Sequence, residues 1–472
     1  MVFVPRSGES NTESERGRGD ARACVTPMHA ASCIAPPRVA PRVSTRAGGR
    51  RARPRSSRGW RVAASGLDDT NDGSSPEDDA DAMRMKRRYV NVTGFPFPLT
   101  PLLSRKTTGK TLVPGRVWTF EQEQGIGLGL GVSTSVVMSV VKLRDGRLWV
   151  HDPIAPTAEL MELLAKHCGS GAKGSKLDVA YVVLATTQYE HKIFAGPFSR
   201  RFPKAQVWVA PGQFSFPVNL PNQFFGIFPA GELDTDGSSM PWRDEIDTKL
   251  LRLPPLFWRS YTYCEAAFLH RDSGAMFVTD AAVFVSERPP EAVPRETLRD
   301  LGAEDGFTIS LLRLGNYRGG RDLPGAGGDR TNAPELCERI GWNRTALFSL
   351  FIAPDARNIL RPNRSFAGLA GKFVVSPIVF MVVFQHHRGA VSEWANAIVA
   401  DWGDDIEHVV SAHFPAFSAE RGERGTAARK FAEAFEWAAT SDETPKEFVD
   451  TNDLKSLELV VRLLRFLKAV PP

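Results

Sequence analysis

The sequence contains little cysteine. It has five cysteines in 472 residues, and no CxxC pair or Cys/His zinc-knuckle spacing occurs among them. A small disulfide framework and a structural zinc finger are therefore excluded, and a reducing compartment fits. The five are Cys24, Cys33, Cys168, Cys264 and Cys337.

Long hydrophobic runs are also absent. The longest apolar stretch, Phe373 to Phe384, is interrupted by Pro377. It is shorter than the roughly 20 residues that a membrane-spanning helix needs. We therefore expect a buried element there and no membrane span.

Residues 1–65 lack lysine and are poor in acids. They contain thirteen arginines and only four acidic residues, among many serines, alanines and prolines. This composition, without a secretory apolar core, is typical of an organelle transit peptide, with cleavage expected near Ala64. The alternative is a basic arm that binds nucleic acid. The acids and the lack of interleaved aromatics argue against it.

Residues 66–88 are predicted to form an acidic, disordered linker. Asp68 to Ala82 contains seven acids and no base, so it repels itself and cannot bury apolar surface. The net charge of the whole chain is +5. Since the basic arm and the acidic run largely cancel, the remainder is close to neutral and offers no surface for nucleic acid.

The remaining chain alternates strands and helices. Ser135–Leu143 and Leu148–Val150 read as a hairpin around Asp145-Gly146, and Thr157 can cap a helix that ends at Cys168. The order of elements predicts an α+β protein with a layered αββα sandwich over 89–440, followed by a C-terminal helix in 441–472. Residues 312–331 are expected to form a surface insertion. Further strands are expected at Tyr181–Ala185, Ala205–Gly212, Glu265–His270, Ala275–Thr279 and Ile406–Phe417, and helices at Ser392–Trp402, Ala427–Ala439 and Leu454–Val470.

Three of these strands end in a side chain that can bind a metal ion. His191 follows "VVLATTQYE", Asp280 follows "AMFVT" and His413 follows "HVVSA". Residues at the ends of different strands can converge at one edge of a sandwich. We therefore expect these three side chains to lie together.

At this point the sequence resembles the metallo-β-lactamase superfamily. The similarity covers roughly residues 89–440 and rests on "LWVHDP", "TTQYEH", "MFVTDA" and "VVSAHF". It implies a four-layer αββα sandwich. The stretches "TTQYEHKIFAGPFSRRFPKAQVWVAPGQFSFPVNLP" and "SAHFPAF" resemble, more narrowly, an uncharacterised plastid and cyanobacterial family with this fold. This narrower resemblance and the leader imply the chloroplast stroma, and bring no established reaction.

The resemblance also implies a degenerate metal signature. Thr186 and Gln188 stand where the superfamily has the first two histidines of H-x-H-x-D-H, so the first metal site is expected to be lost. The positions of the second site retain metal-capable side chains, which suit one zinc, iron or manganese ion. These ligands would be Glu190, His191, Asp280 and His413.

The expected roles follow from that assignment. A bound ion would lower the pKa of a coordinated water. Asp280 and Glu190 would be the catalytic residues that orient this water, and Asp152 would support the ligands from behind. Glu265 is a weaker candidate for a further oxygen ligand. The aromatic stretch Phe214–Phe228 would form an apolar wall beside the site or a loop packed on the sandwich.

Each of these residues also has a structural explanation. His191 and His413 could satisfy hydrogen bonds, Asp280 could cap the following segment, and the Glu190 carboxylate is one methylene longer than the expected aspartate. Three hypotheses therefore stand: a single-metal hydrolase, a metal-free scaffold that binds a partner or small molecule, and an iron-dependent redox protein. The substrate and the oligomeric state stay open.

Other motifs fail on position. The glycine-rich segment Gly125 to Ser135 precedes a strand and does not open a helix, so it is no dinucleotide loop. "LLSRKTTGKT" lacks the first glycine of a phosphate loop, since Ser104 occupies that place. No G-x-S-x-G nucleophile elbow occurs.

Overall fold

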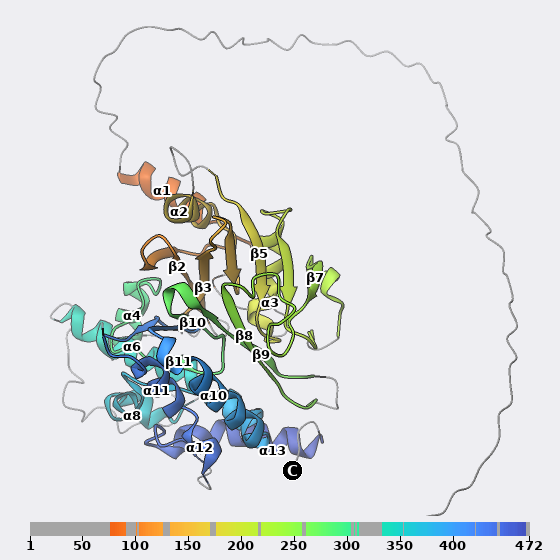
Figure 1. Ribbon diagram of the computed structural model, residues 1–472. Helices are drawn as coiled ribbons and strands as arrows, with labels where there is room; N and C mark the ends of the chain where they lie inside the picture. The colour runs from red at the N-terminus through yellow and green to blue at the C-terminus, as the bar shows by residue number, and fades with distance from the viewer. Residues whose placement is uncertain are drawn as a thin grey trace, which may run out of the picture. The chain divides into compact units, whose positions relative to one another are not determined.

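The computed structural model is shown in Figure 1. The expected transit peptide and the insertion at 312–331 lie outside the described residues, as does the beginning of the linker. The structure describes residues 76–90, 101, 103–125, 133–169, 176–215, 219–256, 261–303, 306, 309–310, 333–352, 354–420, 422–440 and 444–468.

The larger sheet has seven strands in chain order. The strands up to β4 pair antiparallel, and those from β4 to β7 pair in parallel. The expected hairpin is confirmed, since Val141 lies opposite Trp149 and Gly146 takes a φ of 86° in the turn. The strands are β1 (Thr107–Val113), β2 (Val117–Gly125), β3 (Ser133–Lys142), β4 (Leu148–His151), β5 (Val179–Leu184), β6 (Gln206–Val209) and β7 (Pro229–Glu232).

Two helices make the first two of the three parallel connections in this sheet. Helix α2 (Ala158–Cys168) links β4 to β5, and the hydroxyl of Thr157 accepts a hydrogen bond from the Leu160 amide at 3.1 Å. This confirms the predicted cap. Helix α3 (Tyr189–Ser199) links β5 to β6 and begins five residues after β5 ends.

A second sheet has five strands in the order β14-β13-β10-β9-β8. Strands β9 and β10 form the expected antiparallel pair around Gly274, whose φ is 61°. Strand β13 pairs in parallel with β10. The strands are β8 (Ile246–Arg252), β9 (Cys264–His270), β10 (Ala275–Phe277), β13 (His408–Val410) and β14 (Phe417–Ser418), and a separate pair joins β11 (Val283–Phe284) to β12 (Phe373–Val374).

Alternation along the strands divides the main core into three clusters. On β3, Val137 and Val141 pack with Phe268 of β9 and Phe277 of β10 in a cluster that the two sheets share. The intervening side chains, including Met138, face α2 and α3. The other face of the second sheet packs on the C-terminal helices. A period of two residues therefore gives each sheet two buried faces.

Most helices follow β10 in sequence and contribute to that last cluster. Leu454 and Val461 at the end of the chain join it, so the C-terminal helix belongs to the same core. The helices are α4 (Arg295–Gly302), α6 (Pro334–Phe351), α7 (Ala356–Leu360), α8 (Asn363–Leu369), α9 (Pro377–Val382), α10 (Arg388–Trp402), α11 (Thr426–Glu433), α12 (Glu436–Ala439) and α13 (Lys455–Phe466).

The structure differs from the predicted elements in three places. Residues Pro76–Arg87, which we assigned to a disordered linker, form helix α1, whose Arg87 Nε lies 2.9 Å from Glu159 Oε1 of α2. The helix expected over Ala427–Ala439 is interrupted at Phe435, which turns its ring into the core. The strand expected over Ile406–Phe417 is divided into β13 and the start of β14, and His413 lies in the loop between them.

The apolar stretch from Phe373 to Phe384 is buried, as predicted. It contains β12, α9 and a 3-10 turn instead of one continuous element. In the part of the chain that the structure describes, no helix has the length and apolarity required to cross a membrane.

Candidate metal centre

The ends of parallel strands bring two of the candidate ligands together. Asp280 lies three residues after β10, and His413 lies three residues after β13. Met276 of β10 is opposite Val409 of β13 in a parallel register. Because parallel neighbours end at the same edge of a sheet, both loops emerge side by side.

Backbone hydrogen bonds attach the first sheet to this edge. Beyond the end of β5, the Ala266 amide donates to the Ala185 carbonyl at 2.9 Å, and the Thr187 amide donates to the Cys264 carbonyl at 3.0 Å. The first turn of α3, with Glu190 and His191, starts directly after this junction. Its position next to the second sheet is therefore fixed by main-chain contacts.

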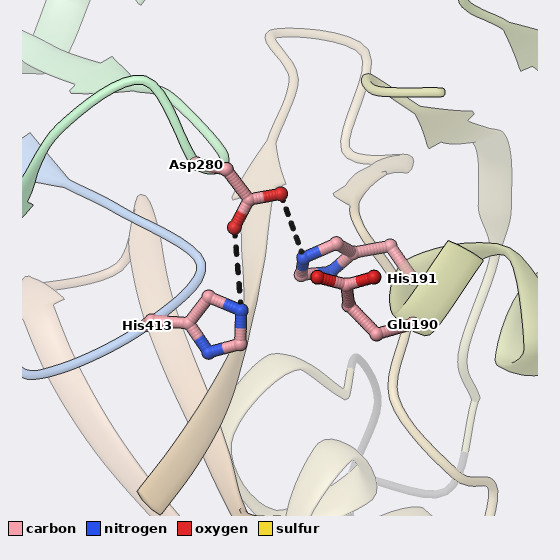
Figure 2. A group of neighbouring side chains, drawn as sticks. All are labelled: Glu190, His191, Asp280 and His413. Carbon is pink, nitrogen blue, oxygen red and sulfur yellow. Dashed lines mark ion pairs between the residues drawn. The ribbon is translucent and has the colours of Figure 1, made fainter. Parts of the chain in front are cut away.

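Four side chains consequently converge. One ligand atom from each of Glu190, His191, Asp280 and His413 lies within 4.8 Å of every other. Figure 2 shows the Asp280 carboxylate between the two imidazoles, with the Glu190 carboxylate beside the His191 ring. All four side chains that the sequence singled out as ligands thus meet at one point.

The distances suit shared coordination of an ion. His191 Nε2 lies 3.4 Å from Asp280 Oδ2, and His413 Nε2 lies 3.3 Å from Asp280 Oδ1. Nitrogen and oxygen ligands of tetrahedral zinc sit about 2.0–2.2 Å from the metal and hence about 3.3–3.6 Å from one another. Both ring nitrogens of His191 are buried without a hydrogen-bond partner among the described residues. The His191–Asp280 pair is an ion pair whose alignment does not make a hydrogen bond.

The orientation of His413 is set by the backbone. Its Nδ1 lies 2.9 Å from the Ser135 carbonyl of β3. Since a carbonyl oxygen only accepts, Nδ1 carries a proton, and Nε2 is the ring nitrogen that faces Asp280 and the cluster. Metal-binding histidines commonly have their second nitrogen held in this way.

The electrostatics of the four groups are strongly perturbed. Burial alone would lower the pKa of His191, but Asp280, Asp152 and Glu190 raise it to about 10. Burial opposes ionisation of Asp280, yet the two histidines hold its pKa below the usual range. Burial and the neighbouring Asp280 raise the pKa of Glu190. The surrounding charges therefore favour a protonated His191 imidazole beside an ionised Asp280.

The positions expected to have lost the first metal site carry groups that bond to the protein. Thr186 Oγ1 accepts from the Gln188 amide at 3.2 Å, and Gln188 Oε1 accepts from the Tyr261 hydroxyl at 3.1 Å. The Thr187 hydroxyl donates to the Thr262 carbonyl at 3.0 Å. These oxygens hold the loop between β5 and α3 in place.

Asp152 supports the cluster from behind, in the place that the sequence suggested. Its Oδ1 accepts from the Ala185 amide at 2.9 Å, and its Oδ2 accepts from the Thr279 hydroxyl at 2.6 Å. Asp152 has a φ of 44°, in the left-handed region, where aspartate is one of the better tolerated residues. It connects the end of β5 to the residue that precedes Asp280.

Glu265 has a different role from the ligand we considered. It is fully buried at the beginning of β9. Its carboxylate accepts from the Tyr263 hydroxyl at 2.6 Å and from the amides of Thr279, Asp280 and Ala281 at 2.8, 3.0 and 3.0 Å. Burial, followed by the Asp280 charge, raises its pKa to about 7. Glu265 thus holds the Asp280 loop, which its sequence position alone did not indicate.

The aromatic stretch after β6 is divided between packing and exposure. Phe214 contacts the Tyr261 ring, with 5.9 Å between centroids, and Phe225 packs over Lys192 of α3. Phe224 and Phe228 are about 70% exposed. Within its described residues, part of this stretch therefore packs as a loop on α3.

A second group with metal-capable side chains occurs at the other end of β9. Glu245, His270 and Asp272 also offer ligand atoms within 4.8 Å of one another. However, the Arg144 guanidinium donates two hydrogen bonds to Asp272, and the Arg144 amide donates to Glu245 at 2.7 Å. The cationic Arg144 side chain already pairs with the carboxylate of Asp272 in this group. The first cluster is therefore the stronger candidate for a metal site.

By its fold and site, this is a mixed α/β protein with a carboxylate and imidazole cluster of the kind that holds a metal ion. The chain belongs to the family described as "Domain of unknown function (DUF4336)", whose model matches residues 114–367 and 360–437. No curated protein matches the chain.

Solved structures similar to this chain include several metallo-β-lactamases. One from Erythrobacter litoralis is 11% identical, with 71% of this chain and 96% of that chain covered and a TM-score of 0.35. One from Hirschia baltica is 8% identical, with 71% and 99% covered and a TM-score of 0.34. The mono-zinc form of FIM-1 from Pseudomonas aeruginosa is 11% identical, with 71% and 96% covered and a TM-score of 0.31.

Proposed function

We propose that this protein is a hydrolase that uses one divalent metal ion, held by Glu190, His191, Asp280 and His413. The observation that carries the proposal is the convergence of these four side chains from three distant segments. The His191 ring nitrogens, which make no hydrogen bond with a described residue, and the His413 Nε2, which faces Asp280, support it further. Two imidazoles and two carboxylates suit zinc, iron or manganese.

A bound ion would supply an activated water and polarise a carbonyl or phosphoryl oxygen. Asp280 lies between the imidazoles and would orient that water, with Glu190 as the second carboxylate. Glu265 fixes the Asp280 main chain through three amides, and Asp152 fixes the preceding threonine. These contacts limit the freedom of Asp280 and favour a preorganised site.

We also infer a metallo-β-lactamase-like αββα arrangement with a degenerate first metal site. The shared cluster between two sheets, flanked by a helix-covered face on each side, supports the layering. Thr186 and Gln188 are engaged in local hydrogen bonds, which supports a single-ion stoichiometry.

A metal-free scaffold is the second candidate, and one observation favours it. Asp280 lies 3.4 and 3.3 Å from the two imidazoles, so protonated rings would offset the carboxylate charges of the cluster. Such a protein would bind a partner or small molecule and catalyse nothing. An iron-dependent redox protein ranks third, because it would also need the first ion.

Elemental analysis separates the first two candidates. The protein would be produced with zinc, iron and manganese supplied, purified, and analysed for each metal. The hydrolase requires close to one ion per chain in the wild type and its loss in His191→Ala. Negligible content of every transition metal would favour the scaffold, and unchanged content in His191→Ala would rule out this site.

We further propose that the protein is directed to the chloroplast stroma. The arginine-rich, acid-poor composition of residues 1–65 supports this. A fluorescent reporter fused to residues 1–66 is expected to enter plastids, whereas the same reporter fused to residues 67–88 should stay outside. Retention of the first fusion in the cytosol would refute the targeting.

A further inference from the structure

Among the described residues, two arginines are completely buried, and their hydrogen bonding differs. Arg344 of α6 donates from Nε to the Ile359 carbonyl at 2.8 Å and from Nη1 to the carbonyls of Leu301 and Gly302 at 2.8 and 3.2 Å. These carbonyls belong to the last turns of α4 and α7, where backbone acceptors lack helical partners. Arg344 is thus a structural arginine with its donors in use.

Arg105, just before β1, is the contrasting case. Its Nη1 donates to the Glu123 carbonyl at 2.8 Å. Its Nε and Nη2 are buried and have no hydrogen-bond partner, and it forms no ion pair with any residue that the structure describes. Nε and one Nη form a side-on fork of two parallel N–H groups, the geometry that binds a carboxylate or phosphate in bidentate fashion.

The position of Arg105 places this fork near the candidate metal centre. Its guanidinium carbon lies 5.0 Å from the centroid of the Phe194 ring. Phe194 follows His191 by three residues in α3, a rise of about 4.5 Å. The Glu123 residue of β2 that accepts from Arg105 is paired with Ser135 of β3. The Ser135 carbonyl in turn orients His413. Arg105 therefore contacts α3, which carries His191, and β2, whose neighbour β3 orients His413.

The charges around Arg105 favour the binding of an anion. Burial lowers the pKa of Arg105 to about 10, although Glu123 and Tyr89 act in the opposite direction, so the side chain remains cationic near neutral pH. A buried cation without a hydrogen-bonded counterion is unfavourable. An anionic group that accepts from both free donors would remove this deficit.

We propose that Arg105 binds an anionic group, a carboxylate or phosphate, of the molecule on which this protein acts. Binding of the anion depends only on the Arg105 fork. Its interpretation as substrate recognition rests on the proposed hydrolase function. A substrate with an anionic end would then be held by Arg105 on one side of α3 and reach the metal cluster with its reacting group.

Isothermal titration calorimetry on the full, metal-free chain tests this proposal. Inorganic phosphate and acetate would be titrated separately, with chloride holding the ionic strength constant. We expect saturable binding by the wild type and loss of binding in Arg105→Gln. In Arg105→Lys, which keeps the charge without the fork, we expect at least tenfold weaker binding. Arg88→Gln is the matched control, because it removes the same charge from an exposed position in the same segment.

The outcomes separate this proposal from the metal site. Preference for phosphate or for acetate would identify a phosphoryl or a carboxylate ligand. Absence of saturable binding in the wild type, or equal binding in Arg105→Gln, would overturn the proposal. If circular dichroism shows that Arg105→Gln does not fold, undiminished binding in Arg105→Lys overturns it instead. Because the titrations use metal-free protein, anion binding can be detected even in a chain that binds no metal ion.

Discussion

Removal of the His413 imidazole should remove most of the stabilisation that metal ions provide. At a free metal concentration 100 times Kd, binding to the folded state alone stabilises it by about 2.7 kcal/mol. Loss of a direct ligand should weaken affinity by about 100-fold, the upper end of the effect of supporting residues. At the same metal concentration His413→Ala would then retain only about 0.4 kcal/mol.

The same substitution also has a metal-independent cost. The His413 side chain is 15% exposed and donates to the Ser135 carbonyl at 2.9 Å. Leaving that acceptor unmatched costs about 1 kcal/mol. Urea unfolding with and without zinc or manganese separates the two effects, because only the difference between the two curves reports the ion.

His408→Ala is the matched control for this experiment. His408 lies on β13, and its Nδ1 is 2.8 Å from Ser418 Oγ, so it loses a comparable hydrogen bond outside the cluster. It should keep the full metal-dependent increment. An equal increment in His413→Ala would place the ion elsewhere, and no increment in the wild type would refute metal binding altogether.

Three further changes test the surroundings of the cluster. Glu265→Gln turns an amide donor towards the backbone amides that the carboxylate now accepts from. It should weaken metal affinity by about 10–100-fold in a competition titration. Unchanged affinity would contradict the positioning role of Glu265. The raised pKa of His191 implies that its contribution to the stability of the metal-free fold is complete below pH 6.5 and lost as pH rises towards 10. Over that range manganese should bind more tightly as its competing proton leaves, and a pH-independent affinity would refute this. Gly196→Ala would place Cβ 2.0 Å from the Phe225 carbonyl oxygen and should lower the unfolding free energy by about 1–3 kcal/mol, whereas Gly389→Ala meets nothing within 4 Å and should be neutral or stabilising.

Much of the fold is predictable because its local signals agree with its long-range packing. The Asp145-Gly146 turn fixed the hairpin, and Thr157 marked the first residue before α2. The juxtaposition of His191, Asp280 and His413 was also predictable, since each follows a strand at the edge where strand ends meet.

The remaining features depend on contacts that one sequence does not reveal. Helix α1 begins in an acidic stretch. The basic residues of its last turn follow that stretch and form ion pairs with α2. Glu265 stands at a position where strand alternation places a buried residue. Its carboxylate oxygens accept hydrogen bonds from a loop 14 to 16 residues further along the chain. Arg105 gives no sequence signal, because only its packing shows which of its donors are free.

The main-chain hydrogen bonds between the two sheets affect which substitutions this fold can accept during evolution. Besides the bonds from Thr187 and Ala266, the Val137 amide of the first sheet donates to the Ala412 carbonyl beside His413 at 2.7 Å. These contacts involve peptide groups, which every substitution short of proline leaves in place. Metal-capable side chains can therefore be replaced one at a time while the two sheets stay joined, and loss of the cluster need not entail loss of the fold.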